Sequence, residues 1–233
     1  MKQPFRIWKD VYIVGSAEIS HPFDCCVYLI DADELVLIDT GAGESVERLV
    51  DNINSLGFAP EKLNSVIATH AHIDHIGGLA YFQQKYGVKI IAHSLDAAAI
   101  ESGKGIGLEF YGVSYQPCRV DVKLDTEESL KFSKHEIKIV HIPGHTPGSI
   151  AVYVDMEKRV LFGQDIHGPY YAAWGADPVQ AVASLQKLID LEADILGEGH
   201  FGIYQPATEV QKYIGSYLSQ LKALTMRKMS GDL

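Results

Sequence analysis

Short apolar runs separated by polar turns occupy the first forty positions of the chain, a pattern typical of β-strands. Residues 11–14 form one run, and residues 26–30 and 35–38 form two more, on either side of the acidic turn 31–34. Two apolar runs joined by so short a polar turn predict a β-hairpin.

The spacing of apolar residues changes after Asp39. They recur at every third or fourth position, which predicts an amphipathic helix closed near Gly57; these residues are Val46, Leu49, Val50, Ile53 and Leu56. A strand at 65–69, a helix at 77–86 and a buried strand at 88–92 follow. Such strand–helix–strand passages predict a sheet covered by helices.

The second half of the chain repeats this order. Strands are expected at 136–141, 149–154, 160–162 and 195–196. Asp177 followed by Pro178 is a strong helix start signal, because Asp caps the free amides and Pro suits the first turn. The buried stripe of that helix is predicted to comprise Val179, Val182, Leu185, Leu188 and Ile189. A final amphipathic helix is predicted from the stripe Val210, Tyr213, Ile214, Tyr217, Leu218 and Leu221.

Two similar β-rich halves with flanking helices predict an α/β fold in which two mixed sheets lie between helical layers. Residues 1–233 contain no linker rich in Pro, Ser or charge, so we expect a single domain. Only residues 94–118 break the regular order, with four glycines and interleaved aromatic residues. Two interpretations of this segment stand: a surface loop, or a lid or substrate wall.

Composition narrows the class of protein. The chain has 20 Lys and Arg against 30 Asp and Glu, a formal charge of −10, which disfavours broad binding to nucleic acid or anionic membranes. Three cysteines cannot form a disulfide framework, and no apolar run reaches transmembrane length. We therefore expect a cytoplasmic protein with reduced thiols. Its 10 histidines are the residues whose roles need explaining.

Three histidines and one aspartate fall within six residues where a strand is predicted to end. His70 and His72 are two positions apart, so in an extended segment they can point at one ion. Asp74 and His75 follow after the turn and are placed to reach a second ion. Imidazole nitrogens and carboxylate oxygens are ligands for zinc, manganese and iron.

Three later residues could complete such a site. His145, Asp165 and His200 each lie just past a predicted strand, where loops carry functional groups in α/β folds. A single histidine of this kind would ordinarily be structural. Their recurrence beside the dense first cluster favours metal binding.

The chain contains, in this order, Asp39-Thr40-Gly41, the HxHxDH stretch from His70 to His75, and then His145, Asp165 and His200. Through these residues the sequence resembles the metallo-β-lactamase fold superfamily of hydrolases over nearly its whole length. The resemblance implies a four-layer αββα sandwich of two mixed sheets flanked by helices. It also implies two divalent metal ions, with zinc favoured and iron or manganese as alternatives.

By the same resemblance, His70, His72 and His145 would hold the first ion, Asp74, His75 and His200 would hold the second, and Asp165 would bridge them. Asp39 would orient a ligand from behind. Many relatives have Gly directly before the bridging Asp, whereas this chain has Gln164.

Two metal ions supply a hydroxide nucleophile at neutral pH, so the implied reaction is attack on an activated carbonyl. Asp74 is the expected catalytic residue, accepting a hydrogen bond from the attacking oxygen and later moving a proton. Within the superfamily the chain is similar to hydroxyacylglutathione hydrolases (glyoxalase II) and to acyl-homoserine lactonases. We favour hydrolysis of a thioester or ester of a small substrate. The alternatives are a lactonase and an iron-dependent oxidoreductase similar to persulfide dioxygenases.

Several residues remain candidates for lesser roles. A proton donor or substrate contact could be His167, Tyr170 or Tyr171, although packing explains each at least as well. His93 is expected to be structural and His135 to face solvent, while Cys25 and Cys26 are expected to be buried apolar residues rather than nucleophiles. The expected partner is a small-molecule substrate, with a homodimer as an option and no nucleic acid or membrane. Two dipositive ions would offset the local negative charge, so the overall charge does not exclude an anionic substrate.

Overall fold

The computed structural model describes residues 1–230, and each of its two β-sheets is built from one contiguous part of the chain. The first sheet has seven strands in sequence order, antiparallel from β1 to β4 and parallel from β4 to β7. Its strands are β1 (Phe5–Trp8), β2 (Val11–Gly15), β3 (Val27–Asp31), β4 (Leu35–Ile38), β5 (Leu63–Ile67), β6 (Lys89–His93) and β7 (Val122–Leu124).

The second sheet has six strands in the order β13-β12-β11-β10-β9-β8. Only the pair β11 and β12 is parallel, because α6 connects these two strands. The strands are β8 (Glu128–Lys131), β9 (Glu136–His141), β10 (Ile150–Met156), β11 (Lys158–Gln164), β12 (Ile195–Glu198) and β13 (Ile203–Tyr204). Both sheets are therefore mixed, as predicted.

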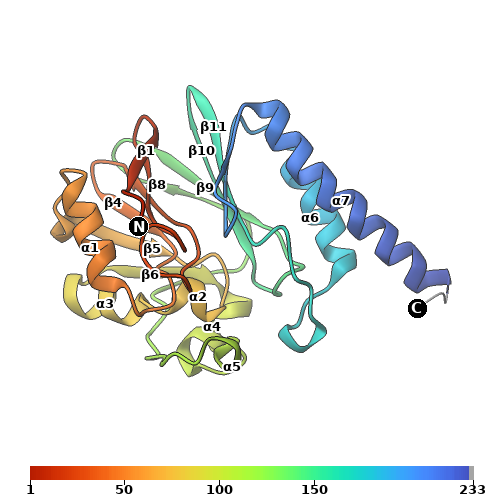
Figure 1. The fold of residues 1–233 in the computed structure, drawn as a ribbon, viewed down its shortest axis with the longest axis horizontal. Helices are drawn as coiled ribbons and strands as arrows, with labels where there is room; N and C mark the ends of the chain where they lie inside the picture. Colours follow the sequence, from red (N-terminus) through yellow and green to blue (C-terminus); the bar gives the residue numbers. More distant parts are fainter. Residues whose placement is uncertain (231–233) are drawn as a thin grey trace.

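Helices cover the outer faces of the two sheets (Figure 1). On one side lie α1 (Val46–Ser55) and α3 (Leu79–Tyr86), and on the other lie α6 (Pro178–Asp190) and α7 (Ala207–Ser230). The remaining helices are α2 (Ile73–Ile76), α4 (Ser94–Ser102) and α5 (Leu108–Tyr111), with single 3-10 turns at Pro60–Lys62 and Ala172–Trp174. This arrangement confirms the four-layer sandwich.

The hydrophobic core has three layers, one on each side of the two sheets and one between them. Strand β4 shows why: Leu35 and Leu37 pack under the helices of the first half, while Val36 and Ile38 pack between the sheets. Successive side chains of a strand point to opposite faces, so a strand buried on both faces is a continuous apolar run.

Most predicted elements are confirmed, with shifts of one to three residues at their ends. The helix expected at 77–86 is α3, and one extra helical turn, α2, precedes it. The short strands β1, β7, β8 and β13 were not predicted, because two to four residues give too little alternation to detect. Val179 was wrongly placed in a buried stripe: it is 65% exposed in the first turn of α6, before the helix meets the core.

The loops that carry polar residues follow the ends of central strands. β5 leads to the segment 68–72, β11 leads to Asp165, β12 leads to residues 199–202, and the β9–β10 connection spans residues 142–149. Among the described residues, none of the helices is both long and apolar enough to span a bilayer.

Candidate metal centre and active site

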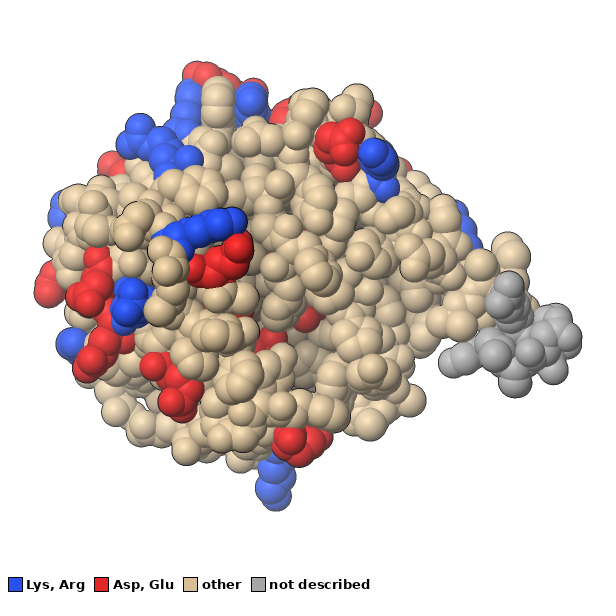
Figure 2. All heavy atoms as spheres, in the orientation of Figure 1, with Lys and Arg blue, Asp and Glu red and all other residues tan. Residues whose placement is uncertain are grey.

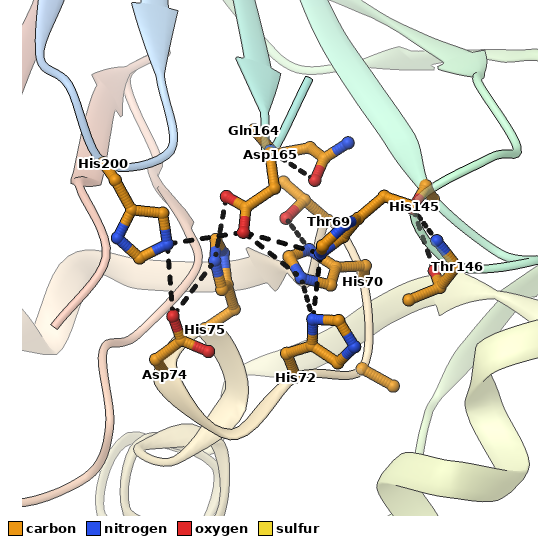
Figure 3. Close-up of polar contacts among 12 residues, drawn as sticks. Thr69, His70, His72, Asp74, His75, His145, Thr146, Gln164, Asp165 and His200 are labelled. Atoms are coloured by element: carbon orange, nitrogen blue, oxygen red, sulfur yellow. Dashed lines mark hydrogen bonds and ion pairs between the residues drawn. The ribbon is translucent and has the colours of Figure 1, made fainter. Parts of the chain in front are cut away.

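Three buried histidine rings converge on one point (Figure 3). His70 and His72 lie between β5 and α2, and His145 lies in the loop that joins β9 to β10. His72 Nδ1 is 3.0 Å from His70 Nε2 and 2.9 Å from His145 Nε2. The structure thus brings together three predicted ligands from both halves of the chain.

These nitrogens fit a shared metal ion. Burial lowers the pKa of all three imidazoles, that of His72 to about 3, so each ring is neutral at pH 7. His145 Nδ1 donates to the Pro169 carbonyl at 2.9 Å, which leaves its Nε2 with a free lone pair. Tetrahedral zinc with Zn–N bonds of about 2.0–2.1 Å places two nitrogens about 3.3 Å apart, close to the observed spacing.

A second cluster adjoins the first. His200 Nε2 lies 3.2 Å and His75 Nε2 3.7 Å from Asp74 Oδ2. Asp165 stands between the two clusters: its Oδ2 is 3.5 Å from His145 Nε2 and 3.3 Å from His200 Nε2, and its Oδ1 is 3.3 Å from His75 Nε2. All seven predicted ligands therefore meet at one place.

The charges of this cluster suit divalent ions. Burial opposes the charge of Asp165, but His75 and His200 hold its pKa well below the usual range. Burial also opposes a charge on His200, yet Asp165 and Asp74 raise its pKa to about 10. A bound dication would displace that proton. His75 Nε2 and Asp165 Oδ1 are buried without a hydrogen-bond partner, as ligand atoms would be.

Asp39 orients His75, one of the predicted ligands, as expected from the sequence. Its Oδ2 accepts from Thr69 Oγ1 at 2.7 Å and from His75 Nδ1 at 2.8 Å, and its Oδ1 accepts from the Thr69 amide. The bond to Nδ1 orients the His75 ring so that Nε2 faces the second cluster, where a bound dication would take the place of the Nε2 proton.

Asp96, near the start of α4, ties together the two loops that carry the first cluster. Its Oδ2 accepts from the amide of Ala71 at 2.9 Å and from Thr146 Oγ1 at 2.7 Å, and its Oδ1 accepts from the amide of Gly148 at 2.8 Å. Ala71 lies between two histidine ligands and Thr146 follows the third. One buried carboxylate thus sets the relative position of all three rings, a role the sequence analysis missed.

Glu198, at the end of β12, is a second buried carboxylate that positions a ligand-bearing loop. Its fully buried carboxylate accepts from the amides of His200 and Phe201 at 2.7 and 2.8 Å, and its other oxygen lies 2.6 Å from His167 Nδ1. The loop that carries His200 and the ring of His167 are therefore positioned by one side chain.

Gly199 lies so close to Asp165 that a side chain would not fit there. A Cβ at Gly199 would lie 2.1 Å from Asp165 Oδ1. The departure from the common motif, Gln164, is accommodated in a left-handed conformation with φ of 45°, and its side-chain oxygen contacts the amide of Asp165. The substitution thus leaves the ligand cluster complete.

Of the other residues considered from the sequence, some lie at the candidate site and others are structural. Tyr170 donates its hydroxyl to the Ile166 carbonyl, and Tyr171 is 55% exposed, whereas His167 lines the cavity beside the ligands. His93 is buried and stacks on His141, as a structural residue would. The expectation that His135 faces solvent was wrong: it is partly buried and lies 2.9 Å from Asp10, a contact between distant segments.

Cys25 and Cys26 are buried, as expected, and burial raises the pKa of both thiols, that of Cys26 to about 12. Neither is a thiolate at pH 7, which disfavours a cysteine nucleophile.

Two aromatic residues that line the same cavity were missed as site residues. Tyr111 comes from α5, and burial, together with the neighbouring Asp74 carboxylate, raises the pKa of its phenol, so it stays protonated. Trp174 packs its ring against His72, with 4.6 Å between centroids. The interleaved aromatic residues of 94–118 were a signal for Tyr111; nothing local marked Trp174.

Comparison with protein families agrees with this geometry. The model of the metallo-beta-lactamase superfamily matches residues 22–200, a range that contains all seven candidate ligands.

Two curated relatives indicate the range of the family. The chain is 32% identical over 145 residues to hydroxyacylglutathione hydrolase GloC of Haemophilus influenzae, covering 61% of this chain and 66% of that protein. It is 26% identical over 216 residues to an acyl-coenzyme A thioesterase of Gallus gallus, covering 79% of this chain and 74% of that protein. The chain spans 59% to 66% of the length of two of the curated relatives it matches.

Among solved structures, the fold is similar to that of the metallo-beta-lactamase GOB-18 from Elizabethkingia meningoseptica. The TM-score is 0.80 at 24% identity, covering 99% of this chain and 93% of the other. At this identity the likeness concerns the fold alone.

Proposed function

The chain belongs to the metallo-beta-lactamase superfamily, and from this premise we propose that it is a metal-dependent hydrolase of thioesters or esters of a small substrate. The observation that carries the proposal is the meeting of seven imidazole and carboxylate groups in two adjoining clusters with Asp165 between them. We propose zinc as the metal, with iron or manganese as alternatives that suit the same donor atoms.

Two such ions, when bound, lower the pKa of water and polarise a carbonyl. The residues of the chain would then do the rest. His70, His72 and His145 would hold the first ion, and Asp74, His75 and His200 the second, with Asp165 shared. Asp74 would also accept a hydrogen bond from the attacking water and take up its proton.

In the reaction, the water oxygen bonds to the acyl carbon and the carbon–sulfur or carbon–oxygen bond breaks, giving a carboxylic acid and a thiol or alcohol. A thiolate can leave without a proton, whereas an alkoxide needs a donor. Tyr170 is already engaged with the backbone, so Tyr111 and His167 are the groups left to contact the leaving atom. Because Tyr111 keeps its proton, the cavity suits esters as well as thioesters. We favour thioesters because the two curated relatives are named as a hydroxyacylglutathione hydrolase and an acyl-coenzyme A thioesterase.

The test is metal analysis combined with a panel of neutral and charged thioesters, esters and lactones. We expect about two ions per chain, hydrolysis of thioesters, loss of activity with a chelator and recovery when zinc is returned. Preference for lactones would identify a lactonase instead. One tightly bound iron, oxygen uptake with a persulfide and no hydrolysis would replace the proposal with an oxidoreductase.

A further inference from the structure

A cavity of 330 Å³ adjoins the two metal-binding clusters, a size that suits a small ligand. The seven ligands are called the metal floor below. The apolar and aromatic residues that line the cavity are called the aromatic wall: Ile106, Tyr111, Pro169, Trp174 and Phe201. The wall combines three separate segments: 94–118, the connection after β11, and the loop after β12.

Aromatic contacts continue from the wall to the rim. The ring of Trp174 lies 5.4 Å from Phe110, and the ring of Phe201 lies 4.7 Å from His167. Phe110 is 65% exposed and Phe201 is 58% exposed. Large aromatic side chains left in solvent around one opening mark a place where an apolar ligand group is bound.

The side chains that line the cavity include carboxylates but neither Lys nor Arg. On the face shown in Figure 2, most basic side chains lie over the N-terminal half and the outer edges, and the centre is mainly uncharged. The fully buried Glu198 stands directly behind His167. An anionic group against the aromatic wall would lose water and gain no cationic side chain, which is costly.

We propose that the group of the substrate beside the scissile carbonyl is uncharged and apolar, preferably aromatic, and is held against Trp174 and Phe201. This inference rests on the proposed function, since it names the substrate class of the same site. With metal ions bound, positive charge in the cavity would be confined to the metal floor, where the carbonyl oxygen would lie. The aromatic wall recognises the neighbouring group by burial and by ring contacts. A substrate with a carboxylate or phosphate at that position is selected against.

The test compares two thioesters that differ in one charge: the S-ethyl thioesters of phenylacetic acid and of 4-carboxyphenylacetic acid. With the zinc-loaded protein we expect kcat/KM to be about tenfold or more higher for the neutral compound. Trp174→Ala and, separately, Phe201→Ala should lower kcat/KM for the neutral compound by about tenfold and reduce the preference. Trp8→Phe is the matched control, because Trp8 donates to Met156 at the far end of the second sheet. Equal rates, or a preference for the carboxylate, would overturn the inference.

A binding measurement keeps the inference separate from the proposed function. In the Trp8→Phe protein, Trp174 is the only tryptophan. Its fluorescence is titrated with N-ethylphenylacetamide and with the 4-carboxy derivative, neither of which is a thioester. Tighter binding of the neutral amide by about tenfold supports the apolar site even if no thioester is cleaved, in which case the proposed function fails alone. Equal or reversed affinity refutes the inference whatever the activity.

Discussion

The metal floor and the aromatic wall adjoin the same cavity but are held in different ways. Three buried carboxylates tie most of the floor: Asp39 holds His75, Asp96 holds the loops of the first three histidines, and Glu198 holds the His200 loop. The wall is held mainly by ring contacts, and parts of it are exposed. The contrast teaches that the floor is built for fixed geometry and the wall for adaptable recognition, so substitutions in the two regions should have different signatures.

Asp165→Asn should have the largest effect. The amide removes the anionic oxygen that lies between the clusters, so we expect turnover to fall by about a thousandfold or more and the bound metal to fall from about two ions per chain to one or fewer. Metal analysis and steady-state kinetics measure this. Asp155→Asn, at an exposed position on β10, is the control. Full metal content with normal turnover would show that Asp165 does not bind the metal ions.

Asp96→Asn should come next, acting without touching the metal. Each carboxylate oxygen accepts from a backbone amide, that of Ala71 or that of Gly148, so the amide nitrogen of Asn must face one of these N–H groups and leave it unpaired. We expect metal affinity to fall about 10–100-fold and the free energy of unfolding to fall by about 1–3 kcal/mol. Competition with a chelator and denaturant titration measure both, with the exposed Asp125→Asn as control. Lost stability with unchanged metal affinity would contradict a positioning role.

Glu198→Gln tests the point where floor and wall meet. The amide can keep the two backbone donors only by turning its nitrogen toward His167, whose Nδ1 must then accept. We therefore expect KM to change about 3–10-fold while metal affinity changes less than in Asp96→Asn. Glu192→Gln, on the surface beside Arg159, is the control. A larger effect on metal than on KM would place Glu198 with the floor alone.

Phe110→Ala should have the smallest effect and confine it to the wall. The ring is exposed and supports Trp174 from outside, so KM for the neutral thioester should rise about two- to threefold. Metal content should not change, and the free energy of unfolding should stay within about 0.5 kcal/mol. Phe5→Ala, an exposed ring on β1, gives the baseline. A change in metal content would show that the two regions are not separable.

The same contrast explains what could be predicted from the sequence. Four of the seven floor residues are encoded locally: His70, His72, Asp74 and His75 lie within six positions after a strand, and their spacing alone suggests ions. The layers follow from apolar periods of two and of three to four residues. Both kinds of signal lie within short windows of sequence, which is why fold and cluster were found together.

The wall and the supporting carboxylates depend on packing between distant segments. Asp96 reads as an ordinary first-turn residue of a helix, yet its partners lie 25, 50 and 52 positions away. Trp174 and Tyr111 share a cavity only because two long connections fold toward the same opening. Val179 and His135 were misjudged for the same reason: burial depends on what packs against a residue, and neither was marked by its neighbours in sequence.

The division of the chain between the sheets has a consequence for biosynthesis. The first sheet ends at Leu124 and the second begins at Glu128, and each contributes part of the floor. A nascent chain that has released only its first half offers four of the seven ligands, and the second cluster stays incomplete until His200 leaves the ribosome. The two-metal site would therefore be completed late and would link the two halves, so we expect apoprotein and holoprotein to differ most in how readily these halves separate.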